Sequence, residues 1–464
     1  MAFFIPFNAC TTSDLEPSTE QNKPVEGGIT SVTNLYGVLK GAYNFMTFSG
    51  YYGRDYIITN EVRTDNCWSN GNSGRFTTQA SLAYNENTGF FWDEGYNVIA
   101  SANAIISQDI NSLEGDTDFG THIQGQAYAL RALAHFDLLK QYGQMNAGGS
   151  LGIPYITEFV GANAYPARNT VSEVKTMIMS DLETAFNLMS DDYYDSSKRF
   201  MSKYTAKALE SRVAIYFGDW ETAKSAAEAV IASGHYSIVS KDNYVASWQS
   251  NGSSNSLFEL AFSATDNLSS NSIAYIYRTT KQGAPSGGSY GDIQVIDEVA
   301  DIFEAGDVRG VGGILGWEDP EINEVVPYDP NKVLLLRNIG KYPDNKGYND
   351  IPVIRYEEVI LNYAEALMHT GGDALTQLNL IPANRGASLY ATATEENILN
   401  ERRKELMFEG LRFDDLMRTG SDIVKYSLQQ NISATVPYGD HRLAFPIPAT
   451  ELNANSNMVQ NDGY

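Results

Sequence analysis

The sequence predicts a mainly α-helical protein, in which helix pairs of the tetratricopeptide type form a scaffold beside a loop-rich half with a few short strands. Two observations indicate this. Several long segments carry apolar residues at helical spacing, whereas residues 51–89 and about 242–348 are rich in Gly, Ser, Asn, Asp and aromatic residues. Long irregular excursions from a rigid scaffold are usually functional or disordered, and the ring content of these two argues against disorder.

The clearest helix pair is "TAKALESRVAIYFGDWETAKSAAEAVIASG", residues 205–234. Ala208, Arg212 and Ile215 share one helical face, and Gly218 ends the first helix before a second begins. Its many small residues allow two helix axes to approach closely, as in tetratricopeptide pairs.

Three further segments have helical periodicity. Residues 125–143 and 353–372 each end on a glycine, which is a common stop at a helix C-terminus. Residues 170–189 begin with Thr170 at an N-cap position and Glu173 at the capping-box position. Together the segments predict about four helix pairs, and strand-like runs such as "SLFELAF" and "VLLLRNI" are short.

Charge and cysteine content exclude several classes of protein. The 464 residues carry a formal net charge of −25 with no basic run, which argues against a nucleic-acid partner. No stretch approaches the roughly 20 apolar residues of a transmembrane helix. The two cysteines, Cys10 and Cys67, make no disulfide framework or zinc motif, so we expect neither a metal site nor a cofactor.

The first ten residues, "MAFFIPFNAC", form a short apolar run that ends on Ala9 and Cys10. They resemble the tail of a bacterial lipoprotein signal peptide, with Cys10 as the lipidated residue. The alternative is an ordinary apolar N-terminus with a free thiol. Residues 11–28 are polar and predict a flexible tether, so residues 1–28 precede the folded part.

The sequence contains little that indicates an enzyme. HExxH, GxSxG and histidine pairs at metal-ligand spacing are absent, and among 57 acidic residues no carboxylate pair is informative. The segment "GGSYGD" has neither the strand-to-helix context nor the lysine of a phosphate-binding loop. The sequence therefore predicts that the protein is not an enzyme.

The densest charge lies in "ILNERRKELMFEGLRFDDLMRTG", residues 398–420. On one continuous helix its opposite charges would pair at i,i+3 and i,i+4, while Arg403 would interrupt an apolar stripe. A buried guanidinium needs a carboxylate partner, and we expect Glu358 or Glu365 to supply it for Arg403.

Six segments follow one another along the chain in an order that can be compared with known families. They are "YNVIASANAII", "GQAYALRALAHFDLLKQYG", "YTAKALESRVAIYFGDWETAKSAAEAVIASGHYSI", "IPVIRYEEVILNYAEAL", "ILNERRKELMFEGLRFDDLMRTG" and "LAFPIPATELNANSNMVQNDGY". In order and spacing they resemble the signature segments of the SusD/RagB family of Bacteroidetes outer-membrane lipoproteins. This resemblance implies that residues 29–464 form a single α-helical domain with four tetratricopeptide-like pairs and an irregular ligand-binding half.

The resemblance also implies a surface-exposed lipoprotein of the outer membrane that closes a SusC-like TonB-dependent transporter and captures its nutrient. That nutrient is usually an oligosaccharide and in some members a peptide. The resemblance favours Cys10 as the lipid anchor. It marks no ligand-binding residues, because members of the family differ most in their binding loops.

Sugar recognition needs flat aromatic faces for C–H groups and planar polar side chains for hydroxyls. The first candidate cluster is "NCWSNGNSGRF", in which Trp68 is accompanied by Asn70 and Arg75 in a Gly-rich loop. The alternative is a Trp68 ring that folds back on the scaffold.

The second cluster is "AYIYRTTKQGAPSGGSYGD". If it is extended, Tyr275 and Tyr277 point to the same side, with Arg278 and Tyr290 nearby. Trp317 is a third candidate, and each of these residues could instead be structural.

We therefore expect a cell-surface glycan-binding lipoprotein that delivers oligosaccharides to its transporter. Two alternatives stay open, namely a peptide-binding receptor of the same architecture and an adaptor that binds protein on a tetratricopeptide-type concave face. An acidic receptor would favour basic peptides through electrostatic steering.

Overall fold

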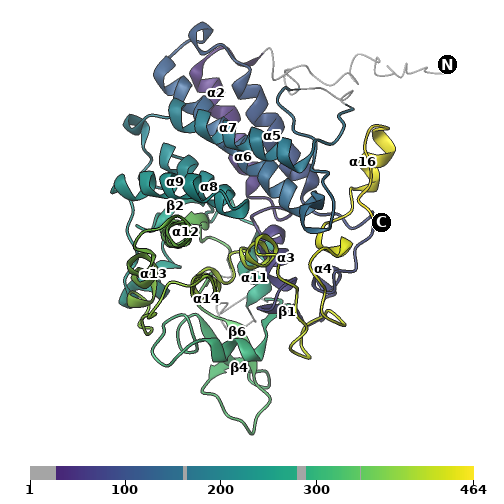
Figure 1. Cartoon of the computed structure of the whole chain (residues 1–464), viewed down its shortest axis with the longest axis vertical. Coiled ribbons are helices and arrows are strands. Elements are labelled where there is room, and N and C mark those ends of the chain that lie inside the picture. The colour runs from purple at the N-terminus through teal and green to yellow at the C-terminus, as the bar shows by residue number, and fades with distance from the viewer. Residues whose placement is uncertain (1–27, 160–164, 279–288, 345) are drawn as a thin grey trace, which may run out of the picture.

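The computed structural model describes residues 28–159, 165–278, 289–344 and 346–464 (Figure 1). Cys10 and nearly all of the expected tether lie outside these residues. The scaffold is built from long helices: α2 (Val32–Met46), α5 (Trp92–Ile106), α6 (Thr117–Tyr142), α7 (Val171–Leu188), α8 (Lys203–Tyr216), α9 (Trp220–Ala232), α12 (Tyr356–Thr370), α13 (Ala374–Ala383) and α14 (Glu395–Leu406).

The scaffold helices pack in four successive pairs. α2 packs on α5, α6 on α7, α8 on α9 and α12 on α13, and contacts of α5 with α6, α7 with α8 and α9 with α12 join one pair to the next. Figure 1 shows α2, α5, α6 and α7 at one end of the molecule and strands β4 (Leu315–Asp319) and β6 (Leu335–Asn338) at the other, while in this view β2 (Ser256–Leu260) lies next to α9 and α12. The expected mainly α-helical, tetratricopeptide-like fold is confirmed.

Local sequence explains these helices. Gly218 adopts a φ of +68° between α8 and α9, and Ala208 and Ala223 are fully buried on the two helices. At α7 the N–H of Glu173 donates to Thr170 Oγ1 at 3.3 Å, while the N–H of Thr170 donates to Glu173 Oε2 at 2.8 Å. The expected helical hairpin and capping box are both present.

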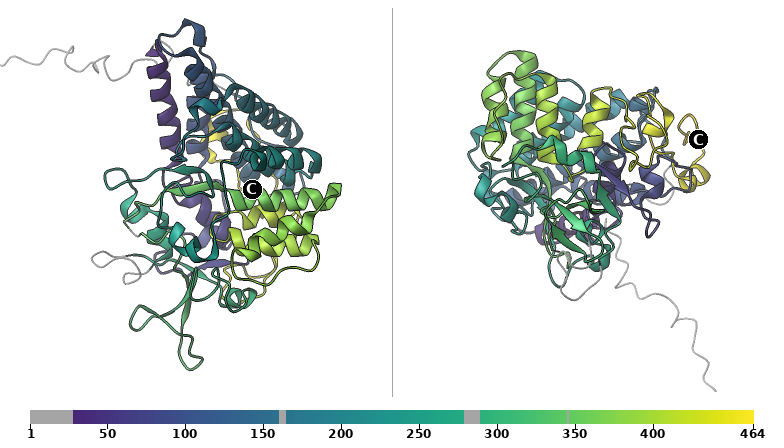
Figure 2. Two further views of the ribbon diagram at one scale, coloured as in Figure 1. Left: turned by 90° about the vertical axis from the view of Figure 1, so that its left-hand side faces the viewer. Right: turned by 90° about the horizontal axis from the view of Figure 1, so that it is seen from below.

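The remaining elements are short. Three antiparallel sheets have the strand orders β1-β3, β2-β7 and β5-β4-β6, and the hairpin of β4 and β5 projects from the body in Figures 1 and 2. The strands are β1 (Cys67–Ser69), β2 (Ser256–Leu260), β3 (Ile293–Val295), β4 (Leu315–Asp319), β5 (Glu324–Val326), β6 (Leu335–Asn338) and β7 (Ile351–Arg355). The short α-helices are α3 (Asp55–Val62), α4 (Thr77–Ala80), α10 (Lys241–Ser247), α11 (Ile273–Tyr277), α15 (Arg412–Arg418) and α16 (Ala449–Ala454), and the 3-10 helices are η2 (Ile110–Ser112), η3 (Gln144–Asn146), η4 (Asp191–Tyr193), η5 (Ser269–Asn271), η6 (Asp297–Ile302) and η7 (His441–Leu443).

Two features of these elements differ from what the sequence predicts. Residues 353–355 belong to strand β7, and helix α12 begins only at Tyr356, because β7 pairs with β2 there. The excursion over residues 51–89 is also less irregular than expected, since it contains α3, β1 and α4. No helix within the described ranges is long and apolar enough to cross a bilayer.

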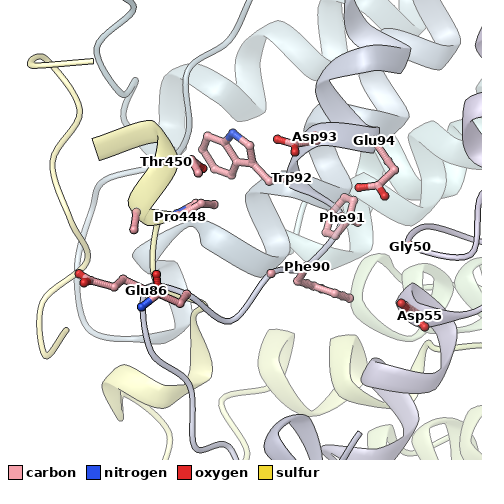
Figure 3. Close-up of a pocket in the computed structure, with 13 residues that line it drawn as sticks. Gly50, Asp55, Glu86, Phe90, Phe91, Trp92, Asp93, Glu94, Pro448 and Thr450 are labelled. Carbon is pink, nitrogen blue, oxygen red and sulfur yellow. The ribbon is translucent and has the colours of Figure 1, made fainter. Parts of the chain in front are cut away.

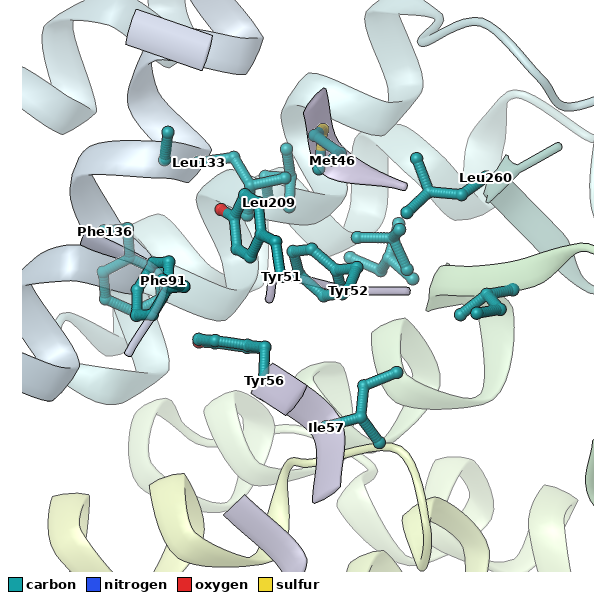
Figure 4. Close-up of a cluster of buried hydrophobic side chains, with 14 of the residues drawn as sticks. Met46, Tyr51, Tyr52, Tyr56, Ile57, Phe91, Leu133, Phe136, Leu209 and Leu260 are labelled. Carbon is teal, nitrogen blue, oxygen red and sulfur yellow. The ribbon is translucent and has the colours of Figure 1, made fainter. Parts of the chain in front are cut away.

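The start of that excursion is part of the core (Figure 4). The hydroxyl groups of Tyr51, Tyr52 and Tyr56 all donate to the buried carboxylate of Asp137, at 2.7, 2.9 and 2.7 Å. Lys140 Nζ lies 3.3 Å from the same carboxylate. A buried charge is stable only when it is paired and hydrogen-bonded, and these tyrosines supply that environment.

The charged segment over residues 401–418 is not one helix. α14 ends at Leu406 and α15 begins at Arg412, and between them Phe408 and Gly410 adopt φ values of +72° and +77°. A Cβ at Gly410 would lie 3.1 Å from the Cα of Ile57, so this turn passes directly against α3. The expected single helical stripe is therefore wrong.

Most charges of this segment pair with other elements instead of with one another. Glu405 is fully buried and accepts from Arg309, Arg355 and Arg385 at 2.9 to 3.2 Å. Burial would raise the pKa of Glu405, but the charges of Arg385 and Arg355 outweigh burial and hold this pKa well below its usual value. Of the expected neighbouring pairs, Asp415 with Arg418 is present at 2.8 Å.

Arg403 corrects a second expectation. Its Nε donates to Asn66 Oδ1 at 2.8 Å, its Nη2 donates to the carbonyl oxygen of Asp65 at 2.7 Å, and its Nη1 lies 3.2 Å from Asp65 Oδ2. Glu358 binds Arg212 and Glu365 binds Arg418, so neither glutamate partners Arg403. Arg403 lies within α14, before the break, and its guanidinium contacts the segment that precedes β1.

Candidate ligand-binding site

The two candidate clusters of the sequence lie on one surface. Strand β1 pairs with β3, which places Trp68 opposite Gln294. Beyond the strands, the N–H of Asn70 donates to the carbonyl oxygen of Asp292 at 2.9 Å, and the side-chain amide of Asn70 donates to Gly291 O at 2.8 Å. Segments that are far apart in the chain thus place their polar and aromatic side chains side by side.

The exposed part of this surface is an arginine stacked on a tyrosine. The guanidinium carbon of Arg75 lies 4.0 Å from the ring centroid of Tyr290, and Arg75 Nη1 lies 3.2 Å from Asp292 Oδ2. The ring of Tyr275 meets that of Tyr290 edge-on at 5.0 Å. Tyr290 is 41% exposed and the Arg75 side chain 34% exposed, whereas Asp292 is buried. We call Trp68, Asn70, Arg75, Tyr275, Tyr290 and Asp292 the Tyr290 surface.

A buried ion pair supports the Tyr290 surface from below. Arg337 of β6 binds Glu318 of β4 at 2.8 Å and donates from Nη1 to the carbonyl oxygens of Gly291 and Ile293 at 2.8 and 3.3 Å. These bonds fix the backbone that carries Asp292. Because the Asp292 carboxylate in turn orients Arg75, the exposed guanidinium is pre-organised.

Trp68 is half-buried and packs against the core. Its Nε1 is buried without a hydrogen-bond partner in the described part of the chain. The ring is thus intermediate between a fully exposed platform and a ring folded back on the scaffold, since one part packs on the scaffold and another part faces outward. Its role as a ligand platform stays a prediction.

Tyr277 and Arg278 lie away from the Tyr290 surface. The segment is helical as α11, not extended, so Tyr275 and Tyr277 point in different directions. Tyr277 is buried near Tyr342, and Arg278 is buried and donates to the carbonyl oxygens of Tyr342 and Ile339. The expectation of one shared side is therefore wrong. Residues 279–288 of this cluster lie outside the described residues.

Trp317 lies in β4 and is 9% exposed. Its ring lies 5.0 Å from that of Tyr328, which is exposed on the projecting hairpin. Trp317 is thus the base of a separate aromatic pair, joined to the Tyr290 surface only through the sheet of β4 and β6.

A cleft of about 440 Å³ lies between residues 86–94 and 448–450, with Gly50 and Asp55 also in its wall (Figure 3). Trp92 and Pro448 form part of its wall, and Asp93 and Glu94 lie on its acidic side. Burial, followed by the charges of Asp93 and Asp55, raises the pKa of Glu94. The segments that form the cleft are remote in the chain, so no local pattern could have predicted it.

Within the ranges that the structure describes, no group of three or more His, Cys, Asp and Glu side chains could hold a metal ion. The Tyr290 surface has rings, amides and a guanidinium, with its one carboxylate buried behind Arg75. Such a surface can bind and orient a polar ligand.

The fold and this surface define a class of protein: a helical-repeat scaffold that presents an aromatic and polar surface on its loop-rich half. The chain belongs to the SusD family. The family model described as "Starch-binding associating with outer membrane" matches residues 14–215, and the model described as "SusD family" matches residues 328–464.

Similar proteins span almost the whole chain. SusD-like protein P38 of Formosa agariphila is 25% identical over 98% of this chain and 96% of its own. The structure of a SusD superfamily protein from Bacteroides vulgatus is 29% identical, with a TM-score of 0.81 over 94% of this chain and 99% of the other. The starch-binding protein SusD of Bacteroides thetaiotaomicron is 33% identical over 130 residues, which are 26% of this chain and 22% of that protein.

The family assignment also bears on catalysis. Proteins of the SusD family are binding proteins and not enzymes, in agreement with the expectation from the sequence. The same family is associated with the outer membrane.

Proposed function

We propose that this protein is a cell-surface, lipid-anchored glycan-binding protein that captures oligosaccharides and delivers them to a SusC-like TonB-dependent transporter of the outer membrane. Cys10 would carry the lipid. The family resemblance and the outer-membrane description of the matching family model support the location and the transporter. The names of two similar proteins, a starch-binding protein and a putative sugar binding protein 27% identical to this chain, support the ligand class.

The observation that carries the proposal is the chemistry of the Tyr290 surface. The rings of Tyr290 and Tyr275 offer apolar faces to the C–H groups of a sugar. Arg75 and Asn70 offer planar donors to its hydroxyls. Each contact is weak, so we expect dissociation constants from micromolar to millimolar, about −8 to −4 kcal/mol.

Calorimetric titration against starch-derived and other neutral oligosaccharides tests the ligand class, with a peptide library as a second arm. Tyr290→Ala should weaken oligosaccharide binding about 10-fold, because it removes the exposed ring and the support of Arg75. Tyr165→Ala is the matched control, since Tyr165 is 52% exposed outside this surface. Equal binding by both variants would remove the Tyr290 surface from the site, and binding of peptides alone would favour the peptide receptor.

Membrane attachment needs its own experiment. In cells, the protein should incorporate radiolabelled palmitate and co-purify with a TonB-dependent transporter, whereas Cys10→Ala should lose the label. A labelled Cys10→Ala variant would disprove lipidation at this residue.

A further inference from the structure

The signature segment that holds the scaffold together also lines an open pocket. The pocket has a volume of about 610 Å³, and its wall includes Asp65, Arg403 and Arg412 on one side and Ser421, Val424 and Tyr426 on the other. It lies where the chain turns after α15. The Tyr290 surface contributes no residue to it.

Two guanidinium groups converge in this pocket on a single carboxylate. Arg412 donates from Nε and Nη2 to the two oxygens of Asp65, both at 2.8 Å, and Arg403 Nη1 lies 3.2 Å from Asp65 Oδ2. Burial would raise the pKa of Asp65, but the charges of Arg412 and Arg403 hold this pKa below its usual value. The carboxylate is thus ionised and shared between two cations.

The pocket retains donor capacity for an anion. Nη1 of Arg412 makes no hydrogen bond with any described residue, and the hydroxyl of Ser421 contacts only that of Thr419, at 2.9 Å. A second pocket of about 270 Å³ shares Arg403 and adds Lys404. The larger pocket is lined by two cations, Arg403 and Arg412, and two carboxylates, Asp65 and Asp422, so its lining is balanced in a chain of net charge −25, and Lys404 adds a cation next to it.

An aromatic ring completes the pocket. Tyr426 is 42% exposed, and its hydroxyl is fixed by donating to the carbonyl oxygen of Asp65 at 2.7 Å. Val424, which is 51% exposed, extends the apolar side. The pocket therefore combines an apolar face with guanidinium donors, and these match the C–H face and the carboxylate of an acidic sugar.

We propose that this pocket binds a carboxylate-bearing sugar unit, a uronate, of the oligosaccharide that the protein captures. The proposal rests on the proposed glycan-binding function and narrows its ligand class. Asp65 and Trp68 are three residues apart, so their Cα atoms lie within about 11 Å of each other. Asn431, in the loop that follows Tyr426, also connects that loop to β1. Its Nδ2 donates to Ser69 O at 2.9 Å, and its Oδ1 accepts from the N–H of Ser69 at 2.9 Å. One oligosaccharide chain can then reach the pocket and the Tyr290 surface.

The experiment compares two variants of the same exposed residue. Val424→Asp places a negative charge at the rim, and Val424→Asn has nearly the same shape without that charge; neither touches the core. Calorimetry measures the affinity of the full chain for a glucuronate-containing oligosaccharide and for the same oligosaccharide with its carboxyl group reduced. Wild-type protein should favour the acidic form about 10-fold. Val424→Asn removes the same apolar contact from both forms of the ligand, so its preference for the acidic form should stay about 10-fold. Relative to Val424→Asn, Val424→Asp should lose about 5-fold in affinity for the acidic form alone.

Several results would overturn the proposal. These are equal affinity for the acidic and reduced forms, equal loss in both Val424 variants, and absence of binding of the acidic form. A second series of titrations uses a short peptide with a free C-terminal carboxylate and the same peptide as its C-terminal amide, to distinguish a uronate from a peptide C-terminus. Binding of the free-acid peptide alone would assign the pocket to peptides. Failure of the glycan-binding function itself is distinguishable, because it would abolish binding of neutral oligosaccharides and their dependence on Tyr290.

Discussion

The charged segment over residues 401–418 and the Tyr290 surface differ in how their charges are paired and exposed. The segment has ten charged residues among eighteen, yet Glu401 and Glu405 are buried in ion pairs with other parts of the chain, and Arg402 is buried against Asp415. The Tyr290 surface has one exposed charge, on Arg75, and its partner Asp292 is buried. Density of charge in a sequence thus indicates a site poorly, because its meaning depends on whether each charge has a partner.

The largest expected effect comes from removing the negative charge of Glu405, at the centre of the charged segment. Glu405→Gln leaves three buried arginines short of a negative charge, and we expect a loss of about 4 to 5 kcal/mol in the free energy of unfolding. Urea denaturation measures it. Glu396→Gln on the same helix is exposed and should change stability by less than about 0.5 kcal/mol. A Glu405→Gln protein as stable as wild type would contradict the structural role of this network.

Two adjacent arginines of the charged segment differ in their burial and should therefore differ in their effect on stability. Arg402 is buried against Asp415 and Asn362, whereas Arg403 is partly exposed beside Asp65. Arg402→Ala should cost about 3 kcal/mol, since it removes one of the two arginines that pair with the buried Asp415. Arg403→Ala should cost about 1 kcal/mol or less. Thermal and urea unfolding of the two variants give this ranking, and the reverse order would refute the assignment of their environments.

A histidine in the scaffold provides a pH test. Burial lowers the pKa of His135 to about 3, from an ordinary value of 6.5. Because the folded pKa is the lower one, the unfolded chain takes up the proton first as the pH falls. His135 therefore contributes a loss of about 1.4 kcal/mol of stability for each pH unit between about 6.5 and 3. Histidine NMR should show a neutral ring at pH 5, and a charged ring there would disprove the burial argument.

The smallest effect on stability belongs to the Tyr290 surface. Because Tyr290 is exposed, Tyr290→Ala should shift the free energy of unfolding by less than about 0.5 kcal/mol while oligosaccharide affinity falls about 10-fold. The same preparations of protein serve for both measurements. Parallel losses of stability and affinity would mean that this ring is part of the scaffold.

The helical scaffold was predictable because its signals are local. Thr170 and Glu173 are three residues apart, and the small residues around Gly218 lie within one helical hairpin. The partners of Arg403 were not predictable, since Asn66 and Asp65 are 337 and 338 residues away in the chain. Nor was the turn at Phe408 and Gly410, which separates α14 from α15. Helical spacing alone assumed that α14 and α15 were continuous.

The candidate site was predictable in its residue types but not in its geometry. The sequence indicated the segments of Trp68 and Tyr290 separately, and only the pairing of β1 with β3 joined them. It also placed Tyr277 beside Tyr275, whereas two residues along a helix turn the side-chain direction by about 200°. Neither the pairing of distant strands nor a short helix can be predicted from the amino-acid composition of a segment.

The pairing of β1 with β3 has a consequence for how the protein folds. Trp68 and Gln294 are 226 residues apart, from 68 to 294, so this contact closes a very long loop. Contacts of such sequence separation form slowly, because the entropy of loop closure opposes them until the intervening helices are in place. The Tyr290 surface is thus among the last parts expected to assemble, and its ligand would recognise only chains that have finished folding.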